Sequence, residues 1–218
     1  MPAAAATAER ALLGEALRYA GGRRALGRVV MLQWRGEAVV HAGGNDVAIG
    51  VATTLVPFSW VRSKSWRLVD GPEKSRTMLI TPEGGWVERG GRTEALAPAF
   101  VGHERAQFAI YALMLLAPIA GGRAKLRRLA DRGPLRVLEV THPLAPPTEL
   151  LFEPSGRLAE ALNRVPDSAG GAPIAQRFIF SEEAVTTAPI RWPRGLRIEQ
   201  EGKPYFELRF DRIETRPF

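Results

Sequence analysis

Cysteine is absent from this chain of 218 residues. The absence excludes disulfides, zinc–thiolate sites and cysteine nucleophiles. Lysine is scarce, because the 30 basic residues comprise 26 arginines and 4 lysines, a skew that together with the many Ala, Gly and Pro residues is typical of a coding bias. No run of four basic residues occurs, and the arginines are interleaved with acidic residues. The net charge of +7 is therefore dispersed, and we expect no specific nucleic-acid partner.

The sequence also lacks a long hydrophobic run. Its most apolar stretch, residues 108–119, is shorter than the roughly 20 residues that a membrane-spanning helix needs. The N-terminus, MPAAAATAER, has no hydrophobic segment of a signal peptide. Ala3 to Ala6 nevertheless resemble the small residues around a signal-cleavage site. Two origins fit this start: a mature exported protein, or a cytoplasmic protein with a loose N-terminus.

Motifs for catalysis and for metal binding are missing as well. The histidines His41, His103 and His142 are not clustered with the spacing of a metal site. His103-Glu104 begins like a zinc-protease helix, but Gln107 stands where the second histidine is required. We place His103 and Glu104 in the first turn of a helix instead, where the helix dipole favours a carboxylate. Without a G-x-S-x-G elbow or a phosphate-binding loop, we predict no enzyme, no metal and no cofactor.

What the sequence does contain is one stretch that is apolar on all sides. Residues 108–119, FAIYALMLLAPI, cover almost every direction of a helix, so this helix has to be wrapped by the rest of the chain. We predict a helix over about 101–117. A second helix is expected over about 8–20, where Gly21-Gly22 stops it.

Most of the remaining chain alternates between apolar and polar residues in short stretches separated by Gly and Pro turns. The pattern is clearest over residues 196–201 and 206–211, which flank the turn Glu201-Gly202-Lys203 and predict a hairpin. Because no internal repeat or low-complexity linker divides the chain, we expect residues 1–218 to form a single domain. The other expected strands cover residues 28–34 with an extension over 38–41, 46–54, 57–61, 66–69, 76–81, 85–88, 135–141, 148–153, 156–165 and 173–181. Residues 62–65 are expected to be a polar link, residues 92–101 a connector, and residues 124–131 a strand or a short helix.

The closing stretch carries a resemblance to a known family. Residues 178–214, FIFSEEAVTTAPIRWPRGLRIEQEGKPYFELRFDRIE, contain a strand, a proline-marked turn at about Trp192-Pro193 and a final hairpin. F-x-P-S-G-R-L at residues 152–158 lies among the middle hairpins. In these stretches and in the order of its elements, the chain resembles the LolA-like family of periplasmic lipoprotein and lipid carriers.

This resemblance implies an α+β fold in which a curved antiparallel β-sheet wraps one or more helices. The sheet would be a half-barrel of about eleven strands, with helices as a lid over a concave apolar face. The chain departs from the family in one respect. Family carriers hold acyl chains in an open hollow, whereas the all-apolar helix can fill this hollow as a plug.

Aromatic residues on the alternating strands are the candidate ligand-binding residues. They either form the core against the helix or line a hollow that binds a lipid. The predicted lining residues are Trp34, Phe58, Trp60, Trp66, Phe178, Phe180, Phe206 and Phe210. The predicted lid residues are Phe108, Tyr111, Met114 and Leu115.

Three functions follow as hypotheses. The first is a non-enzymatic, monomeric carrier or chaperone in the periplasm, its signal peptide removed. Its partners would be a lipid or an acylated protein, with an envelope membrane protein as a further partner. The second is a protein-interaction or envelope-sensor module whose hollow is filled by the apolar helix. The third is an enzyme with a cleft near His103 or His142.

Overall fold

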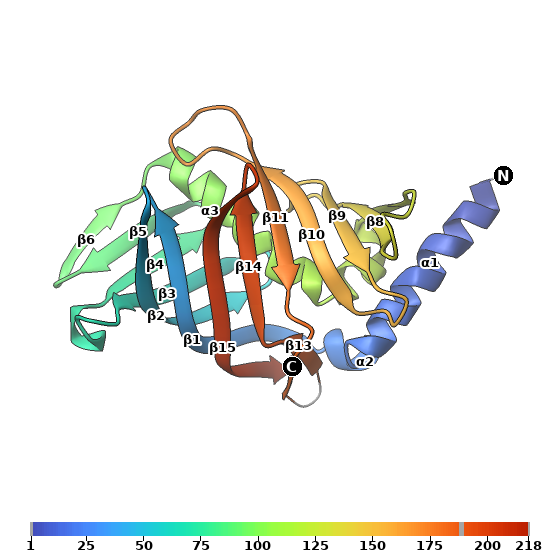
Figure 1. Ribbon diagram of the computed structural model, residues 1–218, viewed down its shortest axis with the longest axis horizontal. Helices are drawn as coiled ribbons and strands as arrows, with labels where there is room; N and C mark the ends of the chain where they lie inside the picture. Colours follow the sequence, from blue (N-terminus) through green and yellow to red (C-terminus); the bar gives the residue numbers. More distant parts are fainter. Residues whose placement is uncertain (1, 188–189, 218) are drawn as a thin grey trace.

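One curved antiparallel sheet dominates the computed structural model, which describes residues 2–187 and 190–217. Within these residues it has 13 strands in the order β6-β5-β4-β3-β2-β1-β15-β14-β11-β10-β9-β8-β7. The sheet curves around helix α3 (Pro98–Met114), as Figure 1 shows. The predicted fold class is therefore confirmed, with more strands than the roughly eleven expected from the family.

The two halves of the chain form the two wings of this sheet. They meet where β1 (Val29–Ala42) pairs with β15 (Lys203–Pro217). The rest of the first wing consists of β2 (Asn45–Val56), β3 (Trp60–Arg67), β4 (Arg76–Thr81), β5 (Gly84–Arg89) and β6 (Arg92–Ala95). The rest of the second wing consists of β7 (Lys125–Arg128), β8 (Arg136–Thr141), β9 (Thr148–Phe152), β10 (Leu158–Val165), β11 (Ile174–Phe180) and β14 (Gly195–Gln200).

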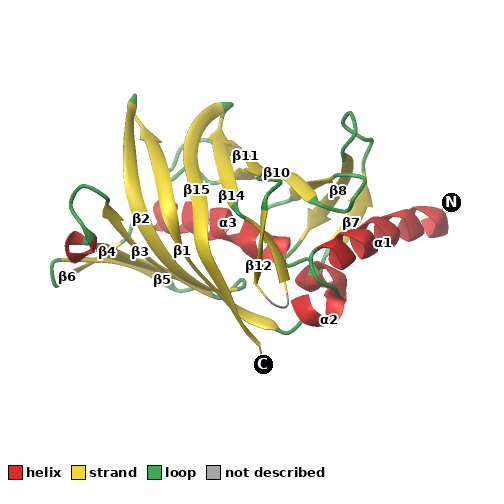
Figure 2. Cartoon of the chain, turned by 60° about the horizontal axis from the view of Figure 1, so that its bottom comes forward, coloured by secondary structure: helices red, strands yellow, loops and turns green. Residues whose placement is uncertain are grey.

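Smaller elements accompany the sheet. Helix α1 lies beside β7 and β8 at the end of the second wing (Figures 1 and 2). The predicted N-terminal helix is confirmed, although it begins earlier than residue 8. These elements are α1 (Pro2–Tyr19), α2 (Arg23–Leu26), the short helices η1 (Pro72–Lys74) and η2 (Ile119–Arg123), and the separate strand pair β12 (Ala184–Thr187) and β13 (Ile190–Pro193).

Alternation along β14 and β15 places every second side chain in the core. Leu196 pairs with Leu208, and both are buried. Arg197 pairs with Glu207 on the opposite face. The predicted final hairpin is confirmed with its turn at Glu201.

The apolar helix is buried as expected, but its bounds differ. It begins at Pro98, since proline is favoured at the first helical position. It ends at Met114. Leu116, two residues later, has a φ of 59°, a left-handed conformation in which a right-handed helix cannot continue. Residues Ala109 to Met114 are all buried, so the helix lies inside the sheet rather than on the surface.

The structure corrects the prediction for residues 57–69. The expected strands at 57–61 and 66–69, with a polar link between them, are one continuous strand, β3. The strand begins only at Trp60, because Phe58 adopts a φ of 58° in the preceding turn. Ser63 takes an inward position, where its hydroxyl oxygen lies 2.9 Å from that of Thr53. Because polar residues occupy inward positions of this strand, the sequence pattern predicted a polar link instead of a strand.

Other boundaries differ less. The expected connector contains a strand, β6, and the ambiguous residues 124–131 contain strand β7. The turn predicted at about Trp192-Pro193 lies one residue later, at Arg194, because Trp192 and Pro193 still belong to strand β13. Residues 188–189 of the family-like stretch lie outside the described residues.

Candidate functional site

The concave face of the sheet, where it meets α3, is the candidate site. It contains six of the eight predicted lining residues, and two of these six are only partly buried. The buried ones are Trp34, Phe178, Phe180 and Phe210, and the partly buried ones are Phe58 and Phe206.

Trp66 lies on the other face, which corrects the prediction for this residue. In the register of β2 and β3, Trp66 is opposite Gly50 and its neighbour Ser65 is opposite the buried Val51. A Cβ atom added to Gly50 would lie 2.3 Å from the Trp66 ring. This ring therefore covers Gly50 on the convex face. By the same alternation, Trp60 occupies an outward position of β3, but it also lines a small pocket beside Phe58 and Phe108.

The predicted lid residues belong to α3 and its C-cap, and they fill the concavity. The ring of Tyr111 stacks on that of Trp34 with centroids 4.8 Å apart. Trp34 in turn meets Phe210 edge-on at 6.1 Å. Met114 and Leu115 are buried. At this level the helix is a plug, as the departure from the family pattern suggested.

Two small apolar pockets among the described residues lie along the plug. One of about 40 Å³ lies beside Phe58 and Phe108. Another of about 50 Å³ lies beside Met114 and Phe180. Pockets for drug-sized ligands have roughly 300–1,000 Å³, so neither of these two pockets holds an acyl chain unless the helix moves.

The two wings also contact each other through residues at the ends of their strands. Phe58, in the turn between β2 and β3, stacks on His142, which follows β8, with centroids 4.2 Å apart. Burial, and then the charge of Arg123, lower the pKa of His142. The Leu144 amide donates a hydrogen bond of 3.2 Å to His142 Nδ1. This contact joins the two wings.

A polar zone lines the concave face near the N-terminal half of α3. Asn163, Gln176 and Gln200 lie directly opposite one another on β10, β11 and β14, and we call them the amide row. Asn163 is 8% exposed and Gln176 is 3% exposed. Gln176 Nε2 donates a 2.8 Å hydrogen bond to Gln107 Oε1 on α3. Asn163 Oδ1, Gln176 Oε1 and Gln200 Nε2 have no partner within the described residues.

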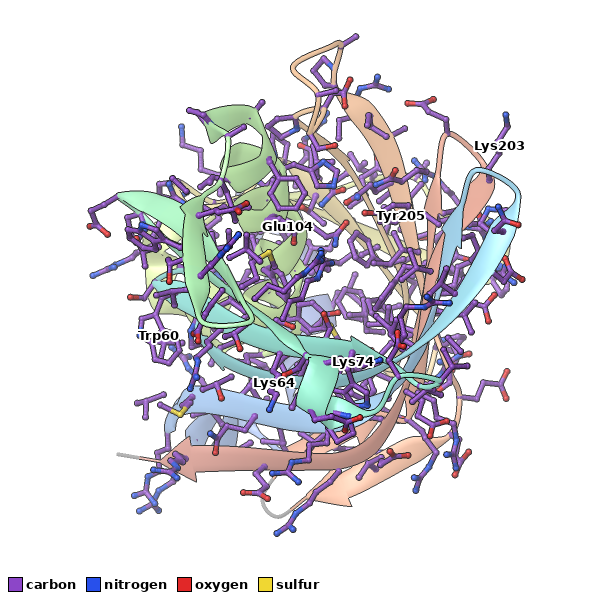
Figure 3. All side chains as sticks on the ribbon, turned by 90° about the vertical axis from the view of Figure 1, so that its left-hand side faces the viewer. Trp60, Lys64, Lys74, Glu104, Lys203 and Tyr205 are labelled. Atoms are coloured by element: carbon purple, nitrogen blue, oxygen red, sulfur yellow. The ribbon has the colours of Figure 1, made fainter. Side chains whose placement is uncertain are left out.

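Glu104 lies one helical turn before Gln107 and is 8% exposed. It forms no hydrogen bond or ion pair within the described part of the chain. Burial raises its pKa to about 7, against the opposing charge of Arg76. Glu104 and Tyr205 of β15 point toward the same space between helix and sheet (Figure 3). Burial, and next the charge of Glu104, raise the pKa of Tyr205 to about 12.

Sequence reasoning missed this polar zone. It placed His103 and Glu104 in the first helical turn, but the helix begins at Pro98, so both are buried in the second turn. His103 Nδ1 lies 2.7 Å from the carbonyl oxygen of Pro166. The available signal was spacing, since residues 104, 107 and 111 share one helical face.

Comparison with known proteins identifies the fold of this chain. No protein-family model and no curated protein matches the chain. A LolA superfamily protein from Nitrosomonas europaea superposes with a TM-score of 0.59 over 96% of this chain and 94% of its own, at 11% identity. The chain has a LolA-like fold.

Two further solved structures share the LolA-like fold. A DUF1329 family protein from Desulfovibrio piger has a TM-score of 0.59 over 95% of this chain and 92% of its own, at 11% identity. A domain assigned to outer membrane lipoprotein sorting, from Vibrio parahaemolyticus, has a TM-score of 0.52 over 85% of both chains, at 11% identity. The expected resemblance is confirmed at the level of fold, which by itself assigns no function.

Other chemistry in the described residues is sparse. They contain no group of three or more His, Asp or Glu side chains placed to hold a metal ion. None of their helices has the length and hydrophobicity to cross a membrane.

Proposed function

We propose that this protein is a non-enzymatic periplasmic carrier or chaperone that shields the acyl chain of a lipid or lipoprotein. The chain would lie between the concave face of the sheet and α3. One observation carries this proposal: the apolar concave face, with Trp34, Phe178 and Phe210, is covered mainly by α3, while α1, α2 and the short pair β12-β13 add residues to the same core. The LolA-like fold supports it, since one structural neighbour is assigned to lipoprotein sorting.

Binding requires an exchange of contacts. The acyl chain replaces side chains of α3 against the sheet, and each methylene that it buries contributes about 0.8 kcal/mol. The displaced helix has to find cover in a shifted position, so the binding-competent conformation is a minor one. Met114, unbranched and adaptable, is suited to packing against either partner. A monomeric carrier would then deliver its ligand to an envelope membrane protein.

A second candidate function has its own support. The stack of Tyr111 on Trp34 fills the concavity, and β6 is a sheet edge that pairs only with β5 in the described sheet. An unpaired edge can take up a strand from another protein. The same fold would then serve as a protein-interaction or envelope-sensor module with a permanent plug.

A titration with a fluorescent fatty acid separates the two functions. For the carrier, we expect saturable binding to the wild type and about three- to tenfold tighter binding to Tyr111→Leu, which removes the aromatic stack that competes with the ligand. Trp66→Leu, on the convex face, is the matched control and should leave the affinity unchanged. Native mass spectrometry of freshly purified protein should detect a co-purified lipid.

Two results would count against the carrier. Absence of saturable binding in both the wild type and Tyr111→Leu would reject it. Binding to Tyr111→Leu alone would indicate a fixed plug and favour the interaction module.

A further inference from the structure

The amide row occupies positions where folding alone favours apolar residues. Its members lie on the same face of the sheet as the core residues. Gln176, for example, is two residues before the fully buried Phe178 in β11. Burying an amide atom without a partner destabilises a fold, and native proteins contain few such groups. Three of them side by side therefore require a reason beyond stability. Ligand binding provides one, because a ligand can supply the missing partners.

The unpartnered atoms specify what such a ligand must offer. Asn163 Oδ1 and Gln176 Oε1 accept hydrogen bonds, whereas Gln200 Nε2 donates them. A hydroxyl group both donates and accepts, so it satisfies either kind of atom. An ammonium group only donates, and a phosphate or carboxylate group only accepts.

The charges around the row also disfavour ions. Glu104 faces the same space, and its carboxylate repels an anionic head group. Arg76 acts on Glu104 from β4 and competes with an ammonium group; its Nε donates a 3.3 Å hydrogen bond to Ser65 Oγ. Lys64, Lys74 and Lys203 lie away from Glu104 and Tyr205 (Figure 3), although Lys203 is opposite Gln200 in the register of β14 and β15. Glu104 can bond a hydroxyl group in either protonation state.

We propose that the amide row, together with Glu104 and Tyr205, is a head-group site for an uncharged, hydroxyl-rich group such as a sugar or glycerol. The acyl chain of the same amphiphile would extend along α3 toward Trp34 and Phe210. This inference rests on the proposed carrier function and adds the chemical class of the ligand. It divides the concave face into an apolar zone for the chain and a polar zone for the head.

Displacement of a fluorescent fatty acid by amphiphiles with the same dodecyl chain tests the site. The four competitors are dodecyl glucoside, dodecanoyl glycerol, dodecyl phosphocholine and dodecyl ammonium, each below its micellar concentration. We expect the glucoside and the glycerol ester to compete at about tenfold lower concentrations than the two charged amphiphiles, as the gain of one or two neutral hydrogen bonds predicts.

Two volume-conserving variants locate the preference. Asn163→Leu and Gln176→Met should each lose it about tenfold. The melting temperature of Asn163→Leu should stay equal or rise, because the substitution removes an unpartnered buried atom. Gln176→Met also removes the hydrogen bond to Gln107 Oε1, so only its ligand preference is used as a readout. A purely structural polar residue would lower the melting temperature instead. Thr53→Val is the matched control. It breaks the satisfied hydroxyl pair with Ser63 on the other wing, so it should lower stability and leave the preference intact.

The outcomes are distinct. Equal competition by all four amphiphiles, or an unchanged preference in both variants, would overturn the head-group site and leave acyl-chain binding standing. If neither the fatty acid nor any dodecyl amphiphile binds to the wild type, the carrier function and the head-group site are both wrong.

Discussion

Glu104 is the residue at which burial and charge conflict most. Its carboxyl group is buried on the inner side of α3, and burial raises its pKa from 4.5 to about 7. Between these two values the folded state binds more protons than the unfolded state. The free energy of unfolding therefore falls as the pH rises through this window, and the loss is complete above about pH 7.

Replacing Glu104 by Gln should remove this dependence. We expect the stability gained by Glu104→Gln to be small near pH 5 and to reach about 3 kcal/mol at pH 8, because one unit of pKa corresponds to about 1.4 kcal/mol. Urea unfolding of wild type and variant at both pH values measures the difference. His142 has the opposite dependence, since its lowered pKa destabilises the fold as the pH falls, but it contributes equally to both proteins.

Glu88→Gln is the control for losing a carboxylate as such, because Glu88 is exposed on β5. An equal gain of stability at pH 5 and pH 8 for Glu104→Gln would show that the buried carboxyl group is not responsible.

For single residues, the sequence predicted which side chains are buried in regular stretches better than it predicted the face on which each residue of an irregular stretch lies. Trp34 and Phe210 lie on the concave face, as the alternation predicts, because each belongs to a stretch with a regular period of two. Trp66 was misplaced, since Ser63 and Ser65 face inward and hide the alternation of β3. The burial of Glu104 depends on where α3 begins, and helix boundaries are the least predictable feature of a helix.

Among the elements, α3 shows what a periodic pattern can and cannot predict. A run that is apolar on every side indicates burial whatever surrounds it, and this prediction is confirmed. The same run indicates nothing about the polar turn that precedes it. The amide row that faces this turn comes from three strands, and their alignment depends on long-range register. No local pattern contains that information.

The buried half of α3 should account for much of the stability of the protein. Leu113 is 1% exposed, and we expect Leu113→Ala to lower the free energy of unfolding by about 2–5 kcal/mol through lost burial and a cavity. Arg105→Ala, at an exposed position of the same helix, should change it by less than about 0.5 kcal/mol. Urea unfolding monitored by circular dichroism gives both values. Equal effects of the two substitutions would mean that α3 is not part of the cooperative core.

For the whole molecule, the seam between β1 and β15 decides how the two wings behave. Gly36 makes this seam possible, since a Cβ atom there would lie 2.0 Å from the carbonyl oxygen of Arg209. The register shifts at the same point, between Arg35 and Gly36. The seam joins the first strand of the chain to the last. Phe58, in the turn before β3, and His142, after β8, form a second contact between the wings. Both connections cross between the halves of the sequence.

Because of these connections, we expect residues 1–218 to unfold as the single domain that the sequence predicts. Two variants test this, each keeping one of the five tryptophans and carrying Phe at the other four positions. One keeps Trp66 on the first wing, and the other keeps Trp192, near the second wing. In each variant, the urea midpoint from fluorescence should coincide with the midpoint from far-ultraviolet circular dichroism. Since both comparisons are made within one protein, destabilisation by the Phe substitutions does not affect them. A fluorescence transition of Trp66 that is separate from that of the backbone would show that the first wing unfolds on its own, and the chain would then contain two folding units that share one sheet.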